Sequence, residues 1–151
     1  MSRSGYSDDY DLGDNSLWLY RGAVKSAIKG RRGQSFLRDL LAALQALPEK
    51  RLIAGHMQTA DCVCAIGAVG KARGVDMSDI DQMIAEADEC GYDMPEIGGE
   101  VAATFGIASA MAREIMFEND EGGAYDETPE RRYDRMVRWV EARLRDPEDS
   151  A

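Results

Sequence analysis

Residues 107–116, with the sequence IASAMAREIM, carry the cleanest amphipathic pattern of the chain. Their apolar side chains recur every three or four positions, at Ile107, Ala108, Met111, Ala112, Ile115 and Met116. Such spacing places all of them on one side of an α-helix, because a helix turns once in about 3.6 residues. The stretch therefore predicts a helix with one buried face and indicates a helical protein.

Similar patterns predict further helices on both sides of this stretch. They lie near residues 16–29, 34–47, 65–73, 78–90, 100–105 and 129–146. Gly30 and Gly33 bracket Arg31 and Arg32, and we expect these four residues to form a tight basic connector between the first two helices. We find no internal repeat.

Two of these helices carry recognisable start signals. Residues 78–81 (Ser-Asp-Ile-Asp) resemble a capping box, with aspartate in place of the usual glutamate. Residues 128–130 (Thr-Pro-Glu) place a hydroxyl cap before a proline at the first helical position and an acid in the first turn. Both signals predict where the chain enters a helix.

The segment from residue 50 to residue 64 is the least certain to be helical. Leu52-Ile53 and Cys62-Val63-Cys64 are short apolar runs that either pair as a small β-hairpin or belong to buried helix. The predicted fold is mainly α: a single compact helical domain of five to seven helices, with or without this hairpin near residues 50–64.

The ends of the chain differ in composition from its middle. Residues 1–15 are rich in Ser, Asp and Gly and are expected to be a flexible N-terminal segment, with a globular helical domain at 16–146 and a flexible tail at 147–151. No apolar run is long enough to span a bilayer, so we expect no membrane partner. Trp18 and Trp139 are expected at the edge of the core.

Charge along the chain is sorted by position. Residues 17–75 hold ten Lys/Arg and three acids, a net charge of +7, whereas residues 76–127 hold fifteen acids and one base, a net charge of -14. The whole chain carries -10. This distribution predicts two faces of opposite sign or their mutual neutralisation inside the fold, and it governs the choice of partner rather than the fold itself.

Potential metal ligands are present without a recognisable metal motif. The spacing of His56, Cys62, Cys64 and Cys90 fits no standard zinc module, and whether these side chains converge is left open. The odd number of cysteines indicates reduced thiols in a cytosol-like compartment. The acidic, glycine-containing loop predicted at 119–127 departs from the EF-hand order, so its first residues, Asn and Asp, are expected to satisfy backbone groups at helix ends. We predict no metal and no cofactor.

The acidic part of the chain is the broader charged surface. It predicts a partner with a basic surface, either a host protein or a protein–nucleic acid complex, reached by direct docking or by mimicry of nucleic-acid phosphates. The expected partner-binding residues are Asp79, Asp81, Glu86, Asp88, Glu89, Glu118, Asp120 and Glu121. The oligomeric state is left open, and a dimer is one alternative.

Two other hypotheses come from different classes of protein. A nucleic-acid-associated accessory protein would contact phosphates through the basic helix at 17–32. Its contact residues would be Arg21, Lys25, Lys29, Arg31 and Arg32. No nucleic-acid-binding motif accompanies them. A small metal-dependent enzyme is the third hypothesis, but no catalytic motif stands out, and we predict no catalytic residues.

Three ordered pieces of sequence carry a resemblance to a group of proteins: GQSFLR at 33–38, CAIGA at 64–68, and ND at 119–120 followed by TPERR at 128–132. Their order resembles small proteins encoded by tailed phages and prophages. The resemblance implies a phage or prophage origin and a place in the cytoplasm of an infected bacterium. Small acidic phage proteins are often inhibitors of host defence, including anti-CRISPR proteins. By this analogy we expect a non-enzymatic protein that binds and inhibits a host macromolecule.

Overall fold

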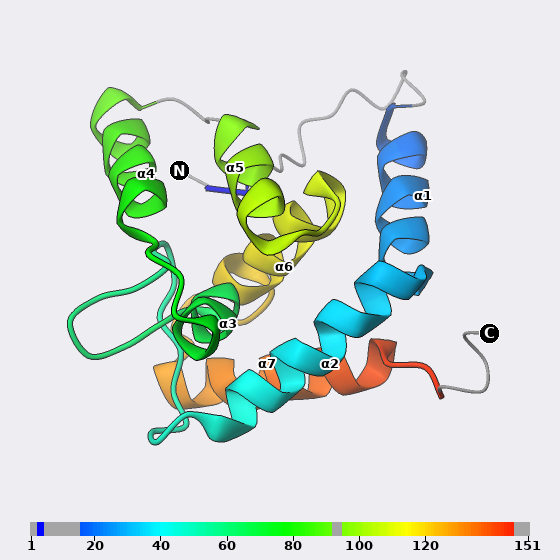
Figure 1. Cartoon of the computed structure of the whole chain (residues 1–151). Coiled ribbons are helices and arrows are strands. Elements are labelled where there is room, and N and C mark those ends of the chain that lie inside the picture. The colour runs from blue at the N-terminus through cyan, green and yellow to red at the C-terminus, as the bar shows by residue number, and fades with distance from the viewer. Residues whose placement is uncertain (1–2, 5–15, 92–94, 147–151) are drawn as a thin grey trace.

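The computed structural model describes residues 3–4, 16–91 and 95–146. Within these residues the chain forms seven α-helices (Figure 1). They are α1 (Ser16–Lys29), α2 (Arg31–Ala46), α3 (Ala65–Arg73), α4 (Ser78–Cys90), α5 (Pro95–Phe105), α6 (Ser109–Glu121) and α7 (Pro129–Arg143). The predicted mainly helical fold of five to seven helices is confirmed.

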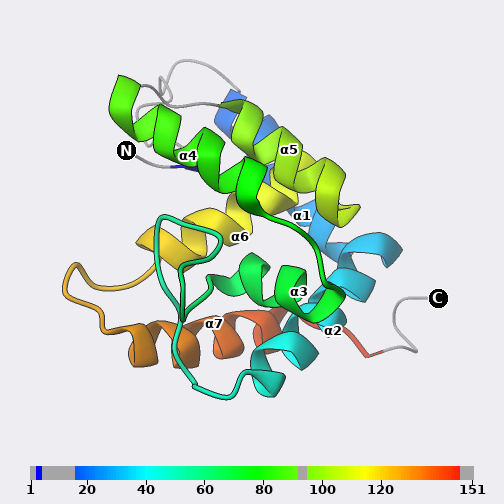
Figure 2. The ribbon, with the colours of Figure 1, turned by 60° about the vertical axis from the view of Figure 1, so that its left-hand side comes forward.

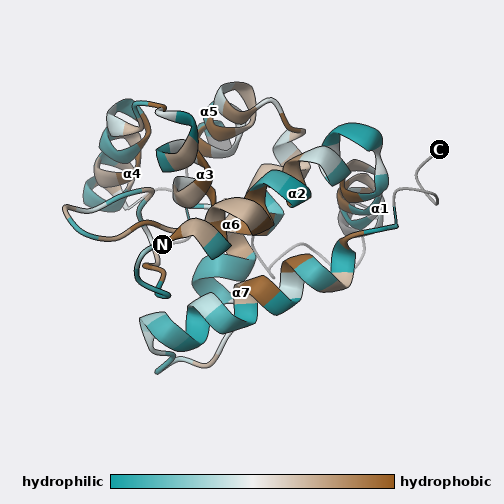
Figure 3. Cartoon of the chain, turned by 60° about the horizontal axis from the view of Figure 1, so that its bottom comes forward, coloured by the Kyte–Doolittle hydropathy of each residue, from teal (hydrophilic) through white to brown (hydrophobic). Residues whose placement is uncertain are grey.

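The centre of the fold is α6, which contains most of the amphipathic stretch at 107–116. It packs against α1, α3, α5 and α7. Met111, Ala112, Ile115 and Met116 are each at most 1 % exposed, and they belong to one continuous core shared by all seven helices. Figure 3 shows α6 enclosed in the middle of the molecule and mainly hydrophilic residues along α7 at its edge. Each large side chain buried in this way contributes about 1.5–3 kcal/mol to stability.

The first two helices meet at Gly30 without the predicted four-residue connector. Arg31 and Arg32 already lie in the first turn of α2, and Gly33 is inside this helix, so that prediction was wrong. The reason is a close helix crossing: a β-carbon built on Gly33 would lie 1.9 Å from the carbonyl oxygen of Ala27 in α1. Gly33 therefore permits backbone contact rather than a turn.

Two other helix starts also differ from the prediction. The capping box is absent from α4: Ser78 donates from its N–H (2.9 Å) and its hydroxyl (2.7 Å) to Asp76, and Asp81 bonds outside its own helix. The N–H and hydroxyl of Ser78 lower the pKa of Asp76 below its ordinary value, because both stabilise the carboxylate. Helix α5 begins at Pro95 rather than near Glu100.

The connection between α6 and α7 is shorter than predicted. Because α6 extends to Glu121, Asn119 and Asp120 lie in its last turn, and the predicted loop starts only at Gly122. The start of α7 is as predicted: the side-chain oxygen of its N-cap, Thr128, accepts the N–H of the third helical residue at 3.2 Å.

The segment between α2 and α3 forms no β-hairpin. Within the described residues it contains one isolated antiparallel bridge (Gln58–Val63) and no strand. Backbone bonds cross the segment at a few positions, as from the N–H of Ile53 to the carbonyl of Val63 at 3.0 Å. Other backbone groups bond to side chains of other elements: the N–H of Met57 donates to Asp81 at 2.8 Å, and the carbonyl of Ile53 accepts from Asn119 at 2.9 Å. Groups engaged in this way are not available for a strand ladder.

The termini are described only in part. Arg3 and Ser4 come from the N-terminal segment predicted to be flexible, yet both are buried. The remainder of that segment and the predicted tail at 147–151 lie outside the described residues. Trp139 is largely buried, close to its predicted place at the core edge, whereas Trp18 is 81 % exposed, contrary to the prediction.

Replacing Gly33 by alanine is expected to lower the free energy of unfolding by roughly 1–3 kcal/mol, because the new methyl group must displace the backbone of α1. Gly22, in α1, is the matched control, since a β-carbon there meets nothing within 4 Å. Gly22→Ala is expected to raise stability by up to about 1 kcal/mol through helix propensity. Urea unfolding measures both, and equal effects would contradict the close crossing.

Candidate functional site

The acidic half of the chain divides into an exposed part and an internally paired part. The exposed part begins on α4, where Asp79, Glu86 and Glu89 lie on one side of the helix, because their spacing matches the helical repeat. This side points away from the core, which α4 contacts through Ile80 and Ile84. These three predicted partner residues are therefore available to another molecule.

Helix α5 extends the exposed acidic part. It packs beside α4, as Figure 2 shows, and the stretch from residue 74 to residue 112 contains no lysine or arginine. We call the exposed carboxylates of the two helices the acidic surface; they are Asp79, Glu86, Asp88, Glu89, Glu96 and Glu100. Among the described residues, none of them forms an ion pair. Glu121, at the end of α6, is also exposed.

Asp81 and Glu118 belong to the internally paired part, contrary to their predicted role at an interface. Asp81 accepts the N–H of Met57 at 2.8 Å and the following N–H at 3.2 Å, which ties α4 to the preceding loop. Glu118 is half-buried, 3.8 Å from a guanidinium nitrogen of Arg135. Burial, followed by the charge of Glu114, raises the pKa of Glu118 above its ordinary value. Both side chains are thus occupied by contacts inside the molecule.

Asp120 is the third predicted partner residue that faces inward. Its carboxylate accepts two hydrogen bonds from the Arg3 guanidinium, at 2.7 and 2.9 Å, and a third from the N–H of Gly55 at 3.1 Å. The remaining guanidinium nitrogen of Arg3 lies 3.4 Å from Sδ of Met57 and 3.5 Å from Sγ of Cys64. With the Arg3 side chain only 2 % exposed, the ion pair is closed off from solvent.

The pocket around Arg3 favours its charged form. Desolvation on burial lowers the pKa of Arg3, but attraction and hydrogen bonding by Cys64 and Asp120 outweigh it, so the pKa lies above its ordinary value. Cys64 also acts as the N-cap of α3, because its sulfur accepts the N–H of Gly67 at 3.3 Å. Asp120, Met57 and Cys64 together surround the positive charge of Arg3.

Asn119, next to Asp120, is buried and bonds to three other parts of the chain. Its Oδ1 accepts the N–H of Ala65 at 3.0 Å and its Nδ2 donates to the carbonyl of Ile53 at 2.9 Å. Its own carbonyl accepts from Nε of Arg132 at 2.9 Å. Ala65 is the first residue of α3, so Asn119 does satisfy a backbone group at a helix start, but at α3 rather than at the helix that follows it in the chain. Asp120 bonds the loop N–H of Gly55 instead of a helix end.

The predicted basic face is only partly exposed. Arg21 forms an ion pair of 2.9 Å with Glu114 and thereby joins α1 to α6. The other four predicted residues are exposed and form no ion pair among the described residues: Lys25, Lys29, Arg31 and Arg32. The acidic and basic halves of the chain therefore neutralise each other in part, and each leaves an unpaired surface.

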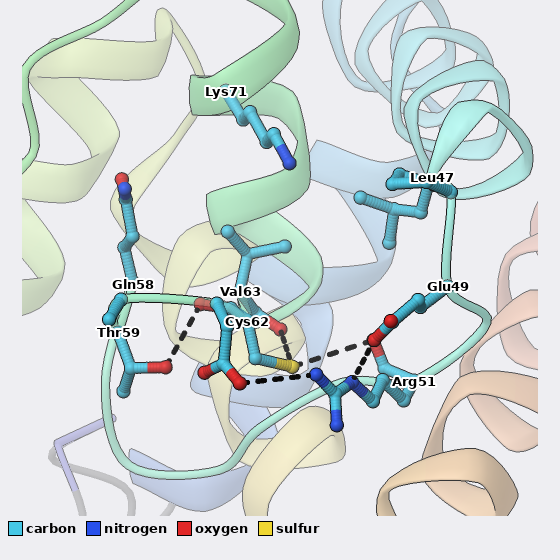
Figure 4. A pocket seen from close by; sticks show the side chains of 11 residues that line it. Leu47, Glu49, Arg51, Gln58, Thr59, Cys62, Val63 and Lys71 are labelled. Atoms are coloured by element: carbon cyan, nitrogen blue, oxygen red, sulfur yellow. Dashed lines mark hydrogen bonds and ion pairs between the residues drawn. The ribbon is translucent and has the colours of Figure 1, made fainter.

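A pocket of about 420 Å³ lies between the end of α2 and the loop before α3 (Figure 4). Lys71 points into it from α3. Across the pocket, Arg51 forms ion pairs with Glu49 at 2.7 Å and Asp61 at 3.3 Å. The half-buried thiol of Cys62 donates to the carbonyl of Arg51 at 3.8 Å. Arg51 and the two acids therefore neutralise one another in part, whereas Lys71 forms no ion pair among the described residues.

The potential metal ligands do not assemble. His56 and Cys90 are exposed, Cys62 is half-buried and Cys64 is buried. In the part of the chain that the structure describes, no three His, Cys, Asp or Glu side chains lie close enough together to hold a metal ion.

Comparison with known proteins adds no assignment, because no protein-family model, curated protein or solved structure matches the chain. Among the described residues, no helix is both long and apolar enough to cross a membrane.

Sequence reasoning missed two arginines that the fold places at important positions. Residues 1–16 contain four acids and a single base, Arg3. Its position as the only base in this segment is the one sequence feature that could have singled it out. Arg73, the last residue of α3, lines a pocket together with Arg31 and Arg32. No sequence pattern links these positions, since tertiary contacts alone bring α3 to α2.

Replacing Arg3 by methionine is expected to lower the free energy of unfolding by about 3 kcal/mol or more, because Asp120 is left buried without its counter-charge. The matched control is Arg38→Met, which removes an exposed arginine of α2 and is expected to change stability by less than about 0.5 kcal/mol. A double-mutant cycle with Asp120→Asn isolates the pair energy by denaturant unfolding. Additive effects would show that the two side chains do not interact.

Glu127, in the loop before α7, gives a pH-dependent prediction. The hydrogen bonds from Arg135, at 2.7 and 2.8 Å, and the charges of Arg135 and Arg132 lower the pKa of Glu127 below its ordinary 4.5. Its stabilising effect is complete above pH 4.5 and is lost as the pH falls through the lowered pKa. Glu127→Gln is expected to cost roughly 1–3 kcal/mol at neutral pH and progressively less in acid.

The control for this pH dependence is Asp126→Asn, which alters the exposed neighbouring acid. It is expected to leave the stability difference nearly flat with pH. Thermal unfolding of both variants between neutral and acidic pH makes the comparison, and a constant deficit of Glu127→Gln at all pH values would contradict the lowered pKa.

Proposed function

We propose that this protein is a non-enzymatic binding protein whose acidic surface on α4 and α5 docks onto a basic surface of a macromolecular partner. The observation that carries the proposal is that these two packed helices present six exposed carboxylates and contain no lysine or arginine of their own. Fixed on helices, the carboxylates keep their spacing, and complementary potentials speed encounter and select the partner.

The contrast with the other acids of the same stretch supports this function. Glu114, Glu118, Asp120 and Glu127 each have an arginine partner inside the molecule. The carboxylates of the acidic surface repel one another, and like-charge repulsion of this kind costs stability in the free protein. A partner with clustered lysines or arginines relieves that repulsion on binding.

The resemblance to phage and prophage proteins supports a partner inside an infected bacterium, in its cytoplasm. A host protein or protein–nucleic acid complex with a basic groove is the corresponding target. An acidic surface placed in such a groove excludes the nucleic acid that the groove normally holds, so inhibition of host defence, as by anti-CRISPR proteins, fits the proposed binding mode.

Charge reversal on α4 tests the proposal. The triple variant Asp79→Lys, Glu86→Lys and Glu89→Lys is expected to lose capture of the host partner from bacterial lysate, and to bind the purified partner at least about tenfold more weakly. The cause is repulsion between the introduced lysines and the cations of the partner. Partners are identified by mass spectrometry and affinities by calorimetry, with circular dichroism to check folding.

The matched control reverses three exposed acids of α7, with Glu130→Lys, Asp134→Lys and Glu141→Lys. It makes the same change in net charge, and like the α4 variant it alters one acid in a first helical turn. The control is expected to keep the partner. A partner retained by the α4 variant, or lost equally by both, would rule out docking through the acidic surface.

A further inference from the structure

A second pocket lies on the basic side of the molecule, where α2, α3 and the α5–α6 connection meet. Its volume is about 400 Å³, within the range of small-ligand pockets. It is lined by Arg31, Arg32, Ser35, Phe36, Asp39, Arg73, Phe105 and Gly106. Three arginines from two helices thus line one cavity, together with a single acid, Asp39.

Arg73 is held in place before any ligand arrives. Its Nη2 lies 2.9 Å from a carboxylate oxygen of Asp39, and its Nη1 donates to the carbonyl of Phe105 at 3.3 Å. The guanidinium carbon also lies 5.6 Å from the centre of the Phe36 ring. A side chain fixed in this way loses little conformational freedom on binding a ligand, which favours affinity.

Arg31 and Arg32 complete the positive wall of the pocket. Both are exposed, and neither forms an ion pair among the described residues. They stand in the first turn of α2, which contains no acid and whose N-cap, Gly30, provides no side-chain cap. Two positive side chains beside the positive end of the helix dipole are electrostatically unfavourable. An anion bound in the pocket would offset this repulsion.

The floor of the pocket is aromatic. Phe36 and Phe105 meet edge to face, with their ring centres 6.4 Å apart. Both rings are only 3 % exposed, so the floor offers a ligand little surface and the cationic wall determines what the pocket binds. Arginine forks bind phosphate oxygens in pairs, so phosphate is the anion that this wall recognises best.

We propose that this pocket binds the phosphate of a nucleotide, supplied either by a free nucleotide or by a nucleic-acid strand. Arg31 and Arg32 bind the phosphate oxygens, and Arg73, held by Asp39 and by the carbonyl of Phe105, borders the site. The arginines of the site lie on α2 and α3, whereas the acidic surface lies on α4 and α5, so the proposal does not depend on the proposed docking function.

The probes are ATP without metal and a fluorescent single-stranded DNA of about twelve nucleotides, each titrated into the full chain. The double variant Arg31→Gln, Arg32→Gln is expected to weaken binding about tenfold or more, since charge-assisted hydrogen bonds are lost. The matched control is Lys29→Gln, Arg38→Gln, which also removes two exposed positive charges, one at the end of α1 and one on α2, at positions outside the pocket. We expect it to weaken binding much less.

A second pair of variants avoids removing any arginine. Ser35→Glu adds a carboxylate to the lining of the pocket and is expected to abolish binding, whereas Ala42→Glu adds one on the exposed side of the same helix and is expected to leave binding intact. Unfolding midpoints close to that of the unaltered protein show that all variants fold.

The two probes distinguish the sources of the phosphate. Saturable ATP binding that competes with the strand assigns a free nucleotide, whereas strand binding alone, weakening steeply between about 50 and 200 mM salt, assigns nucleic acid. The proposal is overturned if neither probe binds at low salt, or if the pocket variants and their controls lose affinity equally.

Discussion

The fold depends on the polar contacts made by two adjacent side chains, Asn119 and Asp120, at the end of the central helix. The apolar face of α6 supplies most of the buried area, but hydrophobic contact is not directional and does not by itself set how the irregular segment before α3 is placed. Asn119 does so by bonding to the first N–H of α3 and to the carbonyl of Ile53. Asp120 adds the N–H of Gly55 and the buried Arg3. Since an unpaired polar group in the core is costly, these bonds select one arrangement of the loop.

The sequence predicts an element of the fold when neighbouring residues decide its backbone structure, and fails when residues remote in sequence decide it. Helical periodicity is local, so the stretch at 107–116 and the Thr-Pro-Glu start of α7 were sufficient to predict two helices and the helical class. The loop between α2 and α3 was not predictable, because side chains remote in sequence decide its backbone bonds. The same reason explains why Gly33 was wrongly predicted to lie in a connector. A glycine is needed there because the backbone of α2 approaches the carbonyl of Ala27 in α1, and no local sequence pattern reveals this contact. Of the predicted acidic site, the residues on the outer side of α4 remain exposed, whereas Asp81, Glu118 and Asp120 are used internally.

Fewer charged residues are therefore available to a partner than the sequence suggests. Arginines from distant parts of the chain neutralise the acids near the core, at Asp120 and at Glu114. The two largest groups of exposed, unpaired charges are separated in space, with the carboxylates of the acidic surface on α4 and α5 and four cations at the end of α1 and the start of α2. A molecule with this arrangement carries a strong electric dipole in addition to its net charge of -10, and a dipole orients the molecule as it approaches a charged partner.

The contact between Arg3 and Asp120 joins residues that are 117 positions apart. During synthesis Arg3 leaves the ribosome early, while α6 and its last turn follow much later. The central helix against which α1, α3 and α5 pack is likewise made after all three of them. The parts of the earlier helices that pack against α6 therefore stay exposed until α6 has been made, and completion of the core is a late, long-range event. In a growing chain, this interval is the period of greatest exposure to aggregation and proteolysis.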